Sequence, residues 1–294
     1  PALPLAAAAD YLALTKPRVV LLILVVTLVG FVLGTPAGLA GLDLALLAPA
    51  LLGTALVAAG TLALNQYLER DLDSLMQRTR HRPLPGGRMH PVQALAFGVA
   101  LVMAGLACLS VAVNPVSGMV TAATVATYLF CYTPMKRRSA LCTVIGAFPG
   151  ALPPVTGYAA ASGGSLDIGA AALFGILFFW QLPHSLAIAQ LYRQDYDRAG
   201  VRLLPTVDAD GGSTQRQIVA NCVTLLAAGM LPAIAGLTGW VSFVVAGAMG
   251  LWMLGRGLSL ALGRHPQAAR RLLMASYVYL PVVLLALALD KTAP

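Results

Sequence analysis

The feature that most limits the fold of this chain is a series of long apolar segments separated by short polar ones. A helix needs roughly 20 predominantly apolar residues to cross about 30 Å of hydrocarbon, because each residue advances it by about 1.5 Å. Only 10% of the 294 residues are charged and 59% are hydrophobic, which leaves no stretch for a separate water-soluble core. We therefore predict one all-α, polytopic membrane domain over residues 1–294, with nine transmembrane helices in a single bundle. The predicted spans are Val19–Leu33, Leu46–Leu68, Ala94–Val113, Gly118–Tyr132, Leu141–Ala160, Ile168–Leu191, Ile218–Leu237, Val241–Leu260 and Leu272–Leu289.

The fifth and sixth predicted spans contain prolines, at Pro149, Pro153, Pro154 and Pro183. Proline lacks the backbone N–H that a helix interior uses, so we expect these spans to be broken there. In lipid, freed backbone groups are tolerated only where they face other helices or a cavity. The two spans are therefore predicted to line a cavity.

Basic residues mark one side of the predicted bundle. Lys and Arg beside membrane spans prefer the cytoplasmic side. The connections near 36–44, 114–117, 162–167 and 238–239 contain neither, whereas the alternate connections are rich in both. We predict a cytoplasmic N-terminus and, after nine spans, a C-terminus outside. The basic residues that indicate the cytoplasmic side are Lys16, Arg18, Arg70, Arg78, Arg80, Arg82, Arg88, Lys136, Arg137, Arg138, Arg193, Arg198, Arg202, Arg216, Arg256, Arg264, Arg270 and Arg271.

The net charge of +8 does not indicate a nucleic-acid partner, because the basic residues cluster beside apolar segments instead of covering a soluble face. A lipid bilayer surface, or an anionic substrate held at one, fits this distribution better. The four cysteines lie scattered in apolar segments without a C-x-x-C pair, so we expect neither disulfides nor a zinc site. They are Cys108, Cys131, Cys142 and Cys222.

Three oxygen-bearing side chains lie four residues apart at the end of the second predicted span: Asn65, Glu69 and Asp73. Residues at this spacing share one face of a helix. Such a face suits a hard divalent cation, since Mg²⁺ takes oxygen ligands and bridges one or two carboxylates to substrate phosphates. The alternative is an ordinary charged helix end whose carboxylates are merely solvated.

A group of cations follows this acidic face, and a second group lies on the next cytoplasmic loop. Carboxylates that hold a metal, beside fixed cations, recur in sites that bind a diphosphate and neutralise it as it leaves. Positive charge that only signals topology is the simpler interpretation, and both can apply. The residues are Arg78, Arg80 and Arg82, then Lys136, Arg137 and Arg138.

The two largest polar loops share a short pattern. One runs from Asp73 to Arg82 and Pro85, and the other from Asp195 to Arg202 and Pro205. They lie four predicted spans apart, as an internal duplication would place them. Such a duplication predicts that both loops meet at one face of the bundle.

Four linked motifs between residues 65 and 205 resemble the UbiA superfamily of intramembrane prenyltransferases, and specifically its branch that farnesylates protohaem IX. The first motif, from Asn65 to Pro85, resembles N-x-x-x-D-x-x-x-D with Glu69 at the middle acidic position. That pattern alone is a weak signal, whereas four motifs in matching order and spacing are a strong one. The other three are Tyr132-Thr133 with Lys136-Arg137-Arg138; Thr143 to Gly146 with Gly150-Ala151, Pro153-Pro154 and Gly157; and Trp180 to His184 with Tyr192 to Tyr196, Ala199-Gly200 and Leu204-Pro205.

The resemblance implies an enzyme of the bacterial cytoplasmic (inner) membrane that transfers a farnesyl group from farnesyl diphosphate to the vinyl group of haem b, forming haem O. It implies a cavity open to the cytoplasm, dependence on Mg²⁺, and Asn65, Glu69 and Asp73 as the metal ligands. It also suggests that haem A synthase or cytochrome oxidase assembly factors are partners. The substrate-binding residues carried over from it are Arg70, Arg78, Arg82, Lys136, Arg137, His184, Tyr192, Arg193 and Tyr196.

The second polar loop departs from the wider superfamily. Many members have D-x-x-x-D there, whereas Tyr192 and Tyr196 occupy those two positions in this chain. Asp195 lies between them and is the candidate for a catalytic acidic role, with Asp197 the weaker one. A second metal site built like the first is therefore in doubt.

His184 lies inside the sixth predicted span, where a polar ring facing lipid would be costly, so we expect it to face the cavity. It could bind the haem iron or a propionate, because imidazole is a common ligand of haem iron. The alternative is a histidine that is hydrogen-bonded within a helix broken at Pro183.

Two other functions remain open at this stage. A sister prenyltransferase that acts on a quinone precursor or chlorophyllide would share the donor chemistry. A secondary transporter for an anionic solute would also have many spans, broken helices and polar groups in the membrane. The polar residues here concentrate at the cytoplasmic ends of the spans, which disfavours a transporter with its site at the bilayer midplane.

Overall fold

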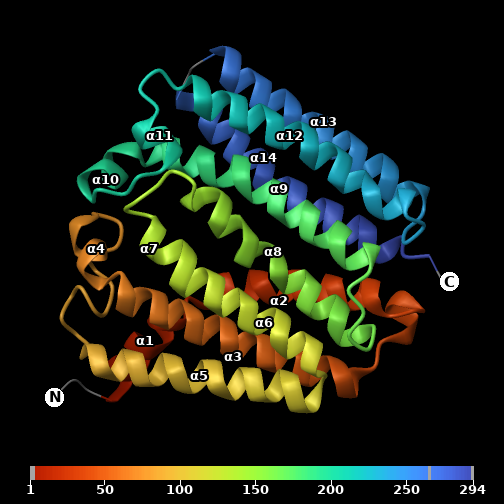
Figure 1. Ribbon diagram of the computed structural model, residues 1–294, viewed down its shortest axis with the longest axis horizontal. Coiled ribbons are helices and arrows are strands. Elements are labelled where there is room, and N and C mark those ends of the chain that lie inside the picture. Colours follow the sequence, from red (N-terminus) through yellow and green to blue (C-terminus); the bar gives the residue numbers. More distant parts are fainter. Residues whose placement is uncertain (1–3, 264–265, 293–294) are drawn as a thin grey trace.

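A computed structural model describes residues 4–263 and 266–292, and it shows a bundle of long, roughly aligned helices (Figure 1). The described residues contain long helices and no β-strand, so the predicted all-α class is confirmed. The long helices are α2 (Pro17–Gly34), α3 (Leu44–Leu68), α5 (Pro91–Ala112), α6 (Pro115–Ala126), α8 (Cys142–Ala161), α9 (Ile168–Leu191), α12 (Gly212–Ile234), α13 (Trp240–Gly263) and α14 (Pro266–Leu289).

Eight helical segments of the described residues are long and apolar enough to cross a membrane, with α6 counted together with its continuation to Met135. The remaining long helix, α8, has 20 residues but includes three prolines and several glycines, which make it less apolar. Most of its residues are buried, and it packs against α2, α6 and α9. A helix shielded from lipid by its neighbours needs less apolar surface. The predicted count of nine spans stays a prediction.

The prolines do not break the helices, contrary to our expectation. Both α8 and α9 continue without interruption through Pro149, Pro153 and Pro154, and through Pro183. Gln181 Nε2 of α9 donates to the Ala147 carbonyl of the neighbouring helix α8 at 3.5 Å and to the Leu177 carbonyl of its own helix at 3.1 Å. Tight packing around α8 therefore keeps proline within a regular helix.

Glycines bring α2 and α8 into close approach. A Cβ atom added to Gly157 would overlap the backbone carbonyl of Thr27, and one added to Gly30 would overlap that of Pro154. Small residues allow such approach between membrane helices. Gly157 therefore serves helix packing in this fold.

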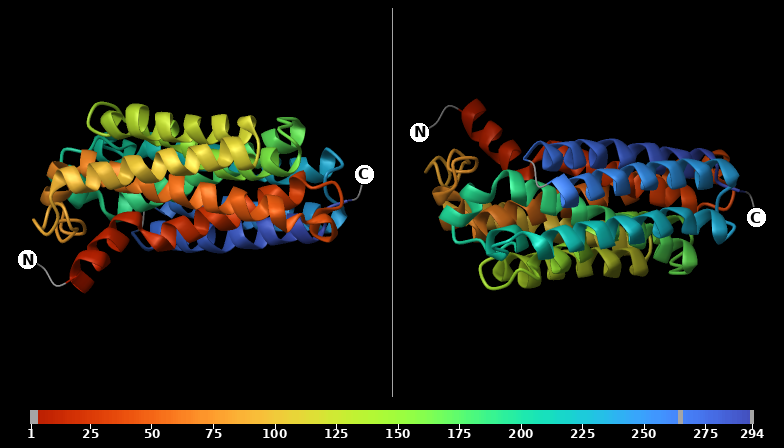
Figure 2. Two further views of the ribbon diagram at one scale, coloured as in Figure 1. Left: turned by 90° about the horizontal axis from the view of Figure 1, so that it is seen from below. Right: turned by 90° about the horizontal axis from the view of Figure 1, so that it is seen from above.

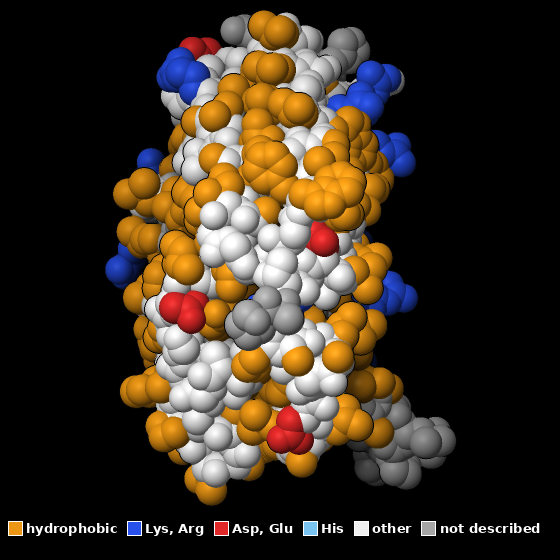
Figure 3. Space-filling view, turned by 90° about the vertical axis from the view of Figure 1, so that its right-hand side faces the viewer, with side chains coloured by type: hydrophobic (Ala, Val, Ile, Leu, Met, Phe, Trp, Pro, Cys, Tyr) orange, Lys and Arg blue, Asp and Glu red, His pale blue; other side chains and the backbone are white. Residues whose placement is uncertain are grey.

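The polar connections gather at one end of the bundle. The short helices α1 (Pro4–Thr15), α4 (Arg70–Leu75), α10 (Arg193–Arg198) and α11 (Leu204–Val207) all lie there, at the left of Figure 1. The start of α1 and the end of α14 lie at opposite ends of the bundle (Figure 2). The opposite end, viewed in Figure 3, is covered mostly by hydrophobic and uncharged side chains with a few acidic ones, and Lys and Arg side chains appear along the edges of the view.

Candidate active site

The acidic face predicted at the end of the second span is present, but the helix carrying it is bent. Helix α3 ends at Leu68 and α4 begins at Arg70, with Glu69 between them. Hydrogen bonds from Glu69 N to the Asn65 carbonyl (2.9 Å) and from Asp73 N to the Glu69 carbonyl (2.7 Å) keep the four-residue register across the bend. The exposed fractions of Asn65, Glu69 and Asp73 are 2%, 8% and 1%. These side chains are buried, so they are not the solvated helix end that remained as an alternative.

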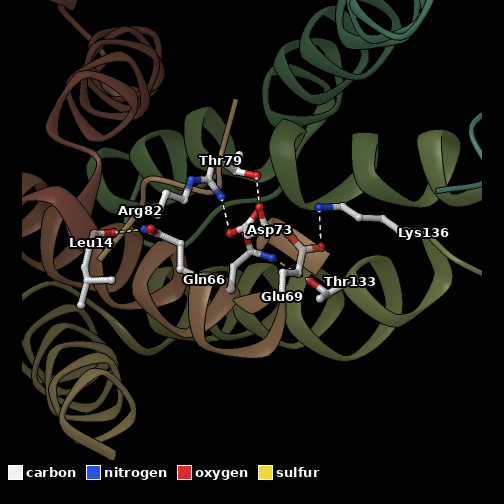
Figure 4. Close-up of polar contacts among 9 residues, drawn as sticks. Leu14, Gln66, Glu69, Asp73, Thr79, Arg82, Thr133 and Lys136 are labelled. Carbon is white, nitrogen blue, oxygen red and sulfur yellow. Dashed lines mark hydrogen bonds and ion pairs between the residues drawn. The ribbon is translucent and has the colours of Figure 1, made fainter. Parts of the chain in front are cut away.

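Each carboxylate of this face has its own cation (Figure 4). Glu69 Oε1 lies 2.6 Å from Lys136 Nζ, and Asp73 Oδ2 lies 2.6 Å from Arg82 Nη1. Asn65 Nδ2 donates to Thr133 Oγ1 at 3.3 Å. The site thus holds two close ion pairs and one amide, with the carboxylates largely shielded from water, so the loss of either cation would leave an uncompensated buried charge.

A π-helical turn positions Lys136, the ion-pair partner of Glu69, at the site. Residues Thr127–Tyr132 form this turn (η2) between α6 and the short helix α7 (Thr133–Met135). The Thr133 hydroxyl donates to the Tyr128 carbonyl at 2.8 Å, and Lys136 Nζ lies 4.6 Å from the centre of the Tyr132 ring. A π-turn shifts the residues that follow it around the helix axis and is frequent at functional sites. Thr133 and Lys136 reach α3 in this way.

Burial alone would lower the pKa of Lys136, but the neighbouring Tyr132 and the Glu69 carboxylate outweigh it, so this pKa is raised above the ordinary value. Lys136 is therefore a fixed cation at neutral pH. Its charge is available to an anionic substrate as well as to Glu69.

The loop after α4 folds back and brings Arg82 into contact with Asp73. The Thr79 hydroxyl donates to the Asp73 carbonyl at 2.8 Å, and Arg82 N donates to the Thr79 carbonyl at 2.9 Å. This turn places the guanidinium beside the Asp73 carboxylate. The sequence had identified Arg82, whereas the supporting role of Thr79 became visible only in the fold.

The donor set of Asn65, Glu69 and Asp73 fits a hard cation of one particular kind. No group of three or more His, Cys, Asp or Glu residues within the described ranges could form a metal cage made of protein alone. Two carboxylates and an amide oxygen instead suit Mg²⁺, which keeps several waters and takes substrate phosphates as further ligands. The residues therefore fit a magnesium ion that binds together with a diphosphate.

The two large polar loops meet, as the predicted duplication requires. Gln77 N donates to Asp195 Oδ1 at 3.3 Å, and the Arg78 guanidinium lies 5.8 Å from the centre of the Tyr192 ring. Asp195 also pairs with Arg198 at 3.3 Å. A small apolar cluster joins the loops at Leu72, Met76, Ala199 and Val201, with Tyr196 packed against it.

An open pocket of about 740 Å³ lies between these loops. Its lining does not include the acidic face of α3, so it is a separate hollow at the same end of the bundle. It is lined by Gln77, Arg78, Gln190, Leu191, Tyr192, Arg193, Gln194, Asp195 and Arg198.

Two of the predicted substrate-binding cations, Arg70 and Arg137, lie apart from both the acidic face and the open pocket. Arg70 turns back along its own chain, where Nη1 donates to the Tyr67 carbonyl at 2.8 Å. Arg137 is exposed. The structure brings neither of them into contact with Asn65, Glu69 or Asp73.

His184 faces α14 and belongs to a hydrogen-bonded cluster there. Its ring stacks on that of Trp180, with centroids 4.7 Å apart and planes 20° apart. The Ser276 hydroxyl donates to the Leu273 carbonyl at 2.7 Å, so the His184 Nδ1–H must be the donor in the 2.8 Å contact with Ser276 Oγ. The neutral ring then carries its lone pair on Nε2.

Sequence reasoning missed Gln66, which lies beside Asn65. Its Nε2 donates to the Leu14 carbonyl at 2.7 Å, and it is 1% exposed (Figure 4). A glutamine within an otherwise apolar span was the signal available in the sequence. This bond ties the short helix α1, which the sequence analysis had not predicted, to the site.

The chain matches known proteins over nearly its whole length. The model of the UbiA prenyltransferase family matches residues 6–280. A relative from Solibacter usitatus (strain Ellin6076), named protoheme IX farnesyltransferase, is 47% identical over 288 residues, which cover 96% of this chain and 98% of the relative.

Solved structures share the fold at low sequence identity. A digeranylgeranylglyceryl phosphate synthase has a TM-score of 0.79 at 15% identity and covers 96% of this chain and 98% of its own. A UbiA homologue from Archaeoglobus fulgidus bound to GPP and Mg²⁺ has a TM-score of 0.63 at 18% identity, covering 95% and 99%.

Proposed function

Because the chain belongs to the UbiA prenyltransferase family, we propose that it transfers a farnesyl group from farnesyl diphosphate to the vinyl group of haem b, forming haem O. The relative at 47% identity carries the name of this activity over nearly the whole of both chains. The observation that carries the proposal in the structure is the pair of buried ion pairs, Asp73–Arg82 and Glu69–Lys136. Buried carboxylates paired in this way often contribute less to stability than hydrophobic residues of similar volume would, which favours a functional role for them.

Asn65, Glu69 and Asp73 would hold Mg²⁺, which supplies positive charge to the departing diphosphate when it is bound. A solved neighbour of the same fold is bound to GPP and Mg²⁺, which supports this assignment. Arg82 and Lys136 would then turn from the carboxylates to the phosphate oxygens, since both cations already lie 2.6 Å from the proposed ligands. Their fixed charge lowers the barrier to breaking the allylic C–O bond.

The reaction needs no nucleophile from the protein. The C–O bond of farnesyl diphosphate breaks with both electrons passing to the diphosphate, and the farnesyl carbon is attacked by the vinyl carbon of haem b. The cation left beside the porphyrin ring takes up water and loses a proton, giving the hydroxyethylfarnesyl group. Positioning and electrostatics in a site poor in water are the contributions of the chain.

His184 is the proposed haem contact. Its Nε2 lone pair is available for iron, because the bond to Ser276 fixes the proton on Nδ1. Arg78, Tyr192 and Arg193 line the open pocket, where arginine forks suit carboxylates such as haem propionates. Asp195 would hold the two polar loops together at this pocket, a role supported by the hydrogen bond that it accepts from Gln77 N.

We propose that the protein lies in the bacterial cytoplasmic membrane, with the polar end and the N-terminus facing the cytoplasm and the C-terminus outside, and with α8 as a ninth span. Haem A synthase or cytochrome oxidase assembly factors would receive the product.

The test is to incubate purified protein with haem b, farnesyl diphosphate and Mg²⁺ and to identify the porphyrin by mass spectrometry. We expect the mass of haem O from the unchanged protein and none from Asp73→Ala. Asp71→Ala is the matched control, because the Asp71 side chain is 90% exposed two residues away. Product from Asp73→Ala at the level of the control would contradict the role given to the acidic face.

A further inference from the structure

Lys16 has an unusual backbone for its residue type. Its φ of 48° and ψ of 65° are left-handed, and no other residue except glycine has a positive φ within residues 4–263 and 266–292. A left-handed conformation costs a residue with a side chain about 1–2 kcal/mol, and such strain clusters at functional sites. Glycine would take this position without cost, so the lysine side chain is the feature that needs explaining.

The hinge that contains Lys16 is fixed against the candidate active site. It joins α1 to α2, and the preceding Leu14 is fully buried. The Leu14 carbonyl accepts the 2.7 Å hydrogen bond from Gln66, the neighbour of Asn65 on α3 (Figure 4). The strained turn is thus anchored one residue away from a proposed magnesium ligand.

Lys16 has no carboxylate partner among the residues that the structure describes, unlike Arg82 and Lys136. Arg82 and Lys136 are each matched by one carboxylate at 2.6 Å. No Asp or Glu of the described part of the chain lies within 4.0 Å of Lys16. Three cations therefore share the site with two carboxylates.

The pKa of Lys16 is shifted by the charged groups of both ion pairs. Burial lowers its pKa to about 8, with further lowering by Arg82 and Lys136 and opposing contributions from Asp73 and Glu69. These four groups form the two ion pairs, so the charge of Lys16 interacts with both pairs. A cation in such a position is stabilised by an additional anion.

We propose that Lys16 binds the diphosphate of the prenyl donor, as the third cation of the site beside Arg82 and Lys136. The inference deepens the proposed function and rests on it. One magnesium ion with a diphosphate ester carries about one negative charge, which complements the single excess positive charge of the three cations and two carboxylates. The strained hinge holds the ammonium group in place before the substrate arrives, which reduces the ordering cost of binding.

Replacing the Lys16 side chain distinguishes a role in diphosphate binding from a role in folding. Lys16→Gly removes the cation and also relieves the backbone strain, so we expect its thermal midpoint to equal or exceed that of the unchanged protein. Its affinity for inorganic diphosphate in the presence of Mg²⁺, measured by calorimetry in detergent, is expected to fall at least about tenfold, as for the loss of one charged hydrogen bond. Lys16→Arg should keep the affinity within about threefold, because the charge is retained.

Arg18→Ala is the matched control, because Arg18 is an exposed cation two residues further along the chain. Its diphosphate affinity should stay close to that of the unchanged protein. Equal affinity in Lys16→Gly and the unchanged protein would overturn the proposal, as would an equal loss in Arg18→Ala. A loss of binding accompanied by a lower thermal midpoint would assign Lys16 to folding and would also overturn it. The binding arm contains no haem, so it is independent of whether the product is haem O.

Discussion

Replacement of Arg82 by methionine tests the central ion pair of the site. Asp73 is 1% exposed and the Arg82 side chain 24%, with 2.6 Å between Oδ2 and Nη1. At an effective dielectric constant of about 20, this separation corresponds to about 6 kcal/mol of Coulomb attraction, part of which desolvation offsets. Removing one partner of a buried pair costs about 3–5 kcal/mol, because the other charge is left uncompensated. The partial exposure of Arg82 sets the expected loss near the lower limit, at about 3 kcal/mol.

The assay is the free energy of unfolding in mixed micelles titrated with dodecyl sulfate, with and without Mg²⁺. We expect Mg²⁺ alone to stabilise the unchanged protein little, because Arg82 already occupies the Asp73 carboxylate. In Arg82→Met that carboxylate is free. With a dissociation constant near 1 mM, 10 mM Mg²⁺ would return about 1.4 kcal/mol of stability.

Arg80→Met is the control for Arg82→Met, because Arg80 is an exposed arginine of the same loop and forms no pair with Asp73. It should change the unfolding free energy by less than about 0.5 kcal/mol. A cost below about 1 kcal/mol for Arg82→Met would refute the assignment of a buried ion pair between Arg82 and Asp73. An equal effect of Mg²⁺ on both variants and the unchanged protein would refute it as well.

Three further changes test other parts of the structure. Lys136→Met should leave a buried glutamate unpaired and raise the KM for farnesyl diphosphate at least about tenfold, whereas Arg137→Met, at an exposed position, should leave KM unchanged in steady-state assays. Ser276→Ala frees the Nδ1 proton of His184, so haem b affinity, followed by the Soret band, should fall about tenfold with diphosphate affinity unaffected. Gly157→Ala should cost about 1–3 kcal/mol of unfolding free energy, because its Cβ meets the backbone of α2, whereas Gly255→Ala, within α13 and with open space around the added Cβ, should cost little.

Hydropathy and the spacing of polar residues predicted the long helices and the acidic face, because both depend on residues close together in the sequence. The apolar segments predicted the long helices, and the four-residue spacing of Asn65, Glu69 and Asp73 predicted a shared face that survives the bend at Glu69. The burial of that face depends on loops that arrive from elsewhere. Arg82 reaches it through the turn at Thr79, and the sequence contains the residues of this turn but not its direction.

The features that the sequence did not predict depend on tertiary packing. Proline has a strong local tendency to break helices, yet α8 passes through three prolines because its neighbours enclose it. The π-turn before Thr133 adds one residue to a helical turn without a distinctive sequence. From the sequence, Lys16 is interpreted only as one of the basic residues that indicate the cytoplasmic side. Its proposed role in diphosphate binding depends on a left-handed backbone conformation that a lysine ordinarily avoids.

The pairing of the site implies that metal and diphosphate bind together. Without an anion, Arg82 and Lys136 are held by the carboxylates that are proposed to bind Mg²⁺, so a cation arriving alone competes with two cations already in place. A diphosphate arriving alone meets cations that are partly neutralised. Each ligand thus removes the obstacle to the other, and by linkage each should raise the affinity of the other by the same factor. Lys16, which no carboxylate neutralises at ion-pair distance within the described residues, is proposed to attract the diphosphate before this exchange begins.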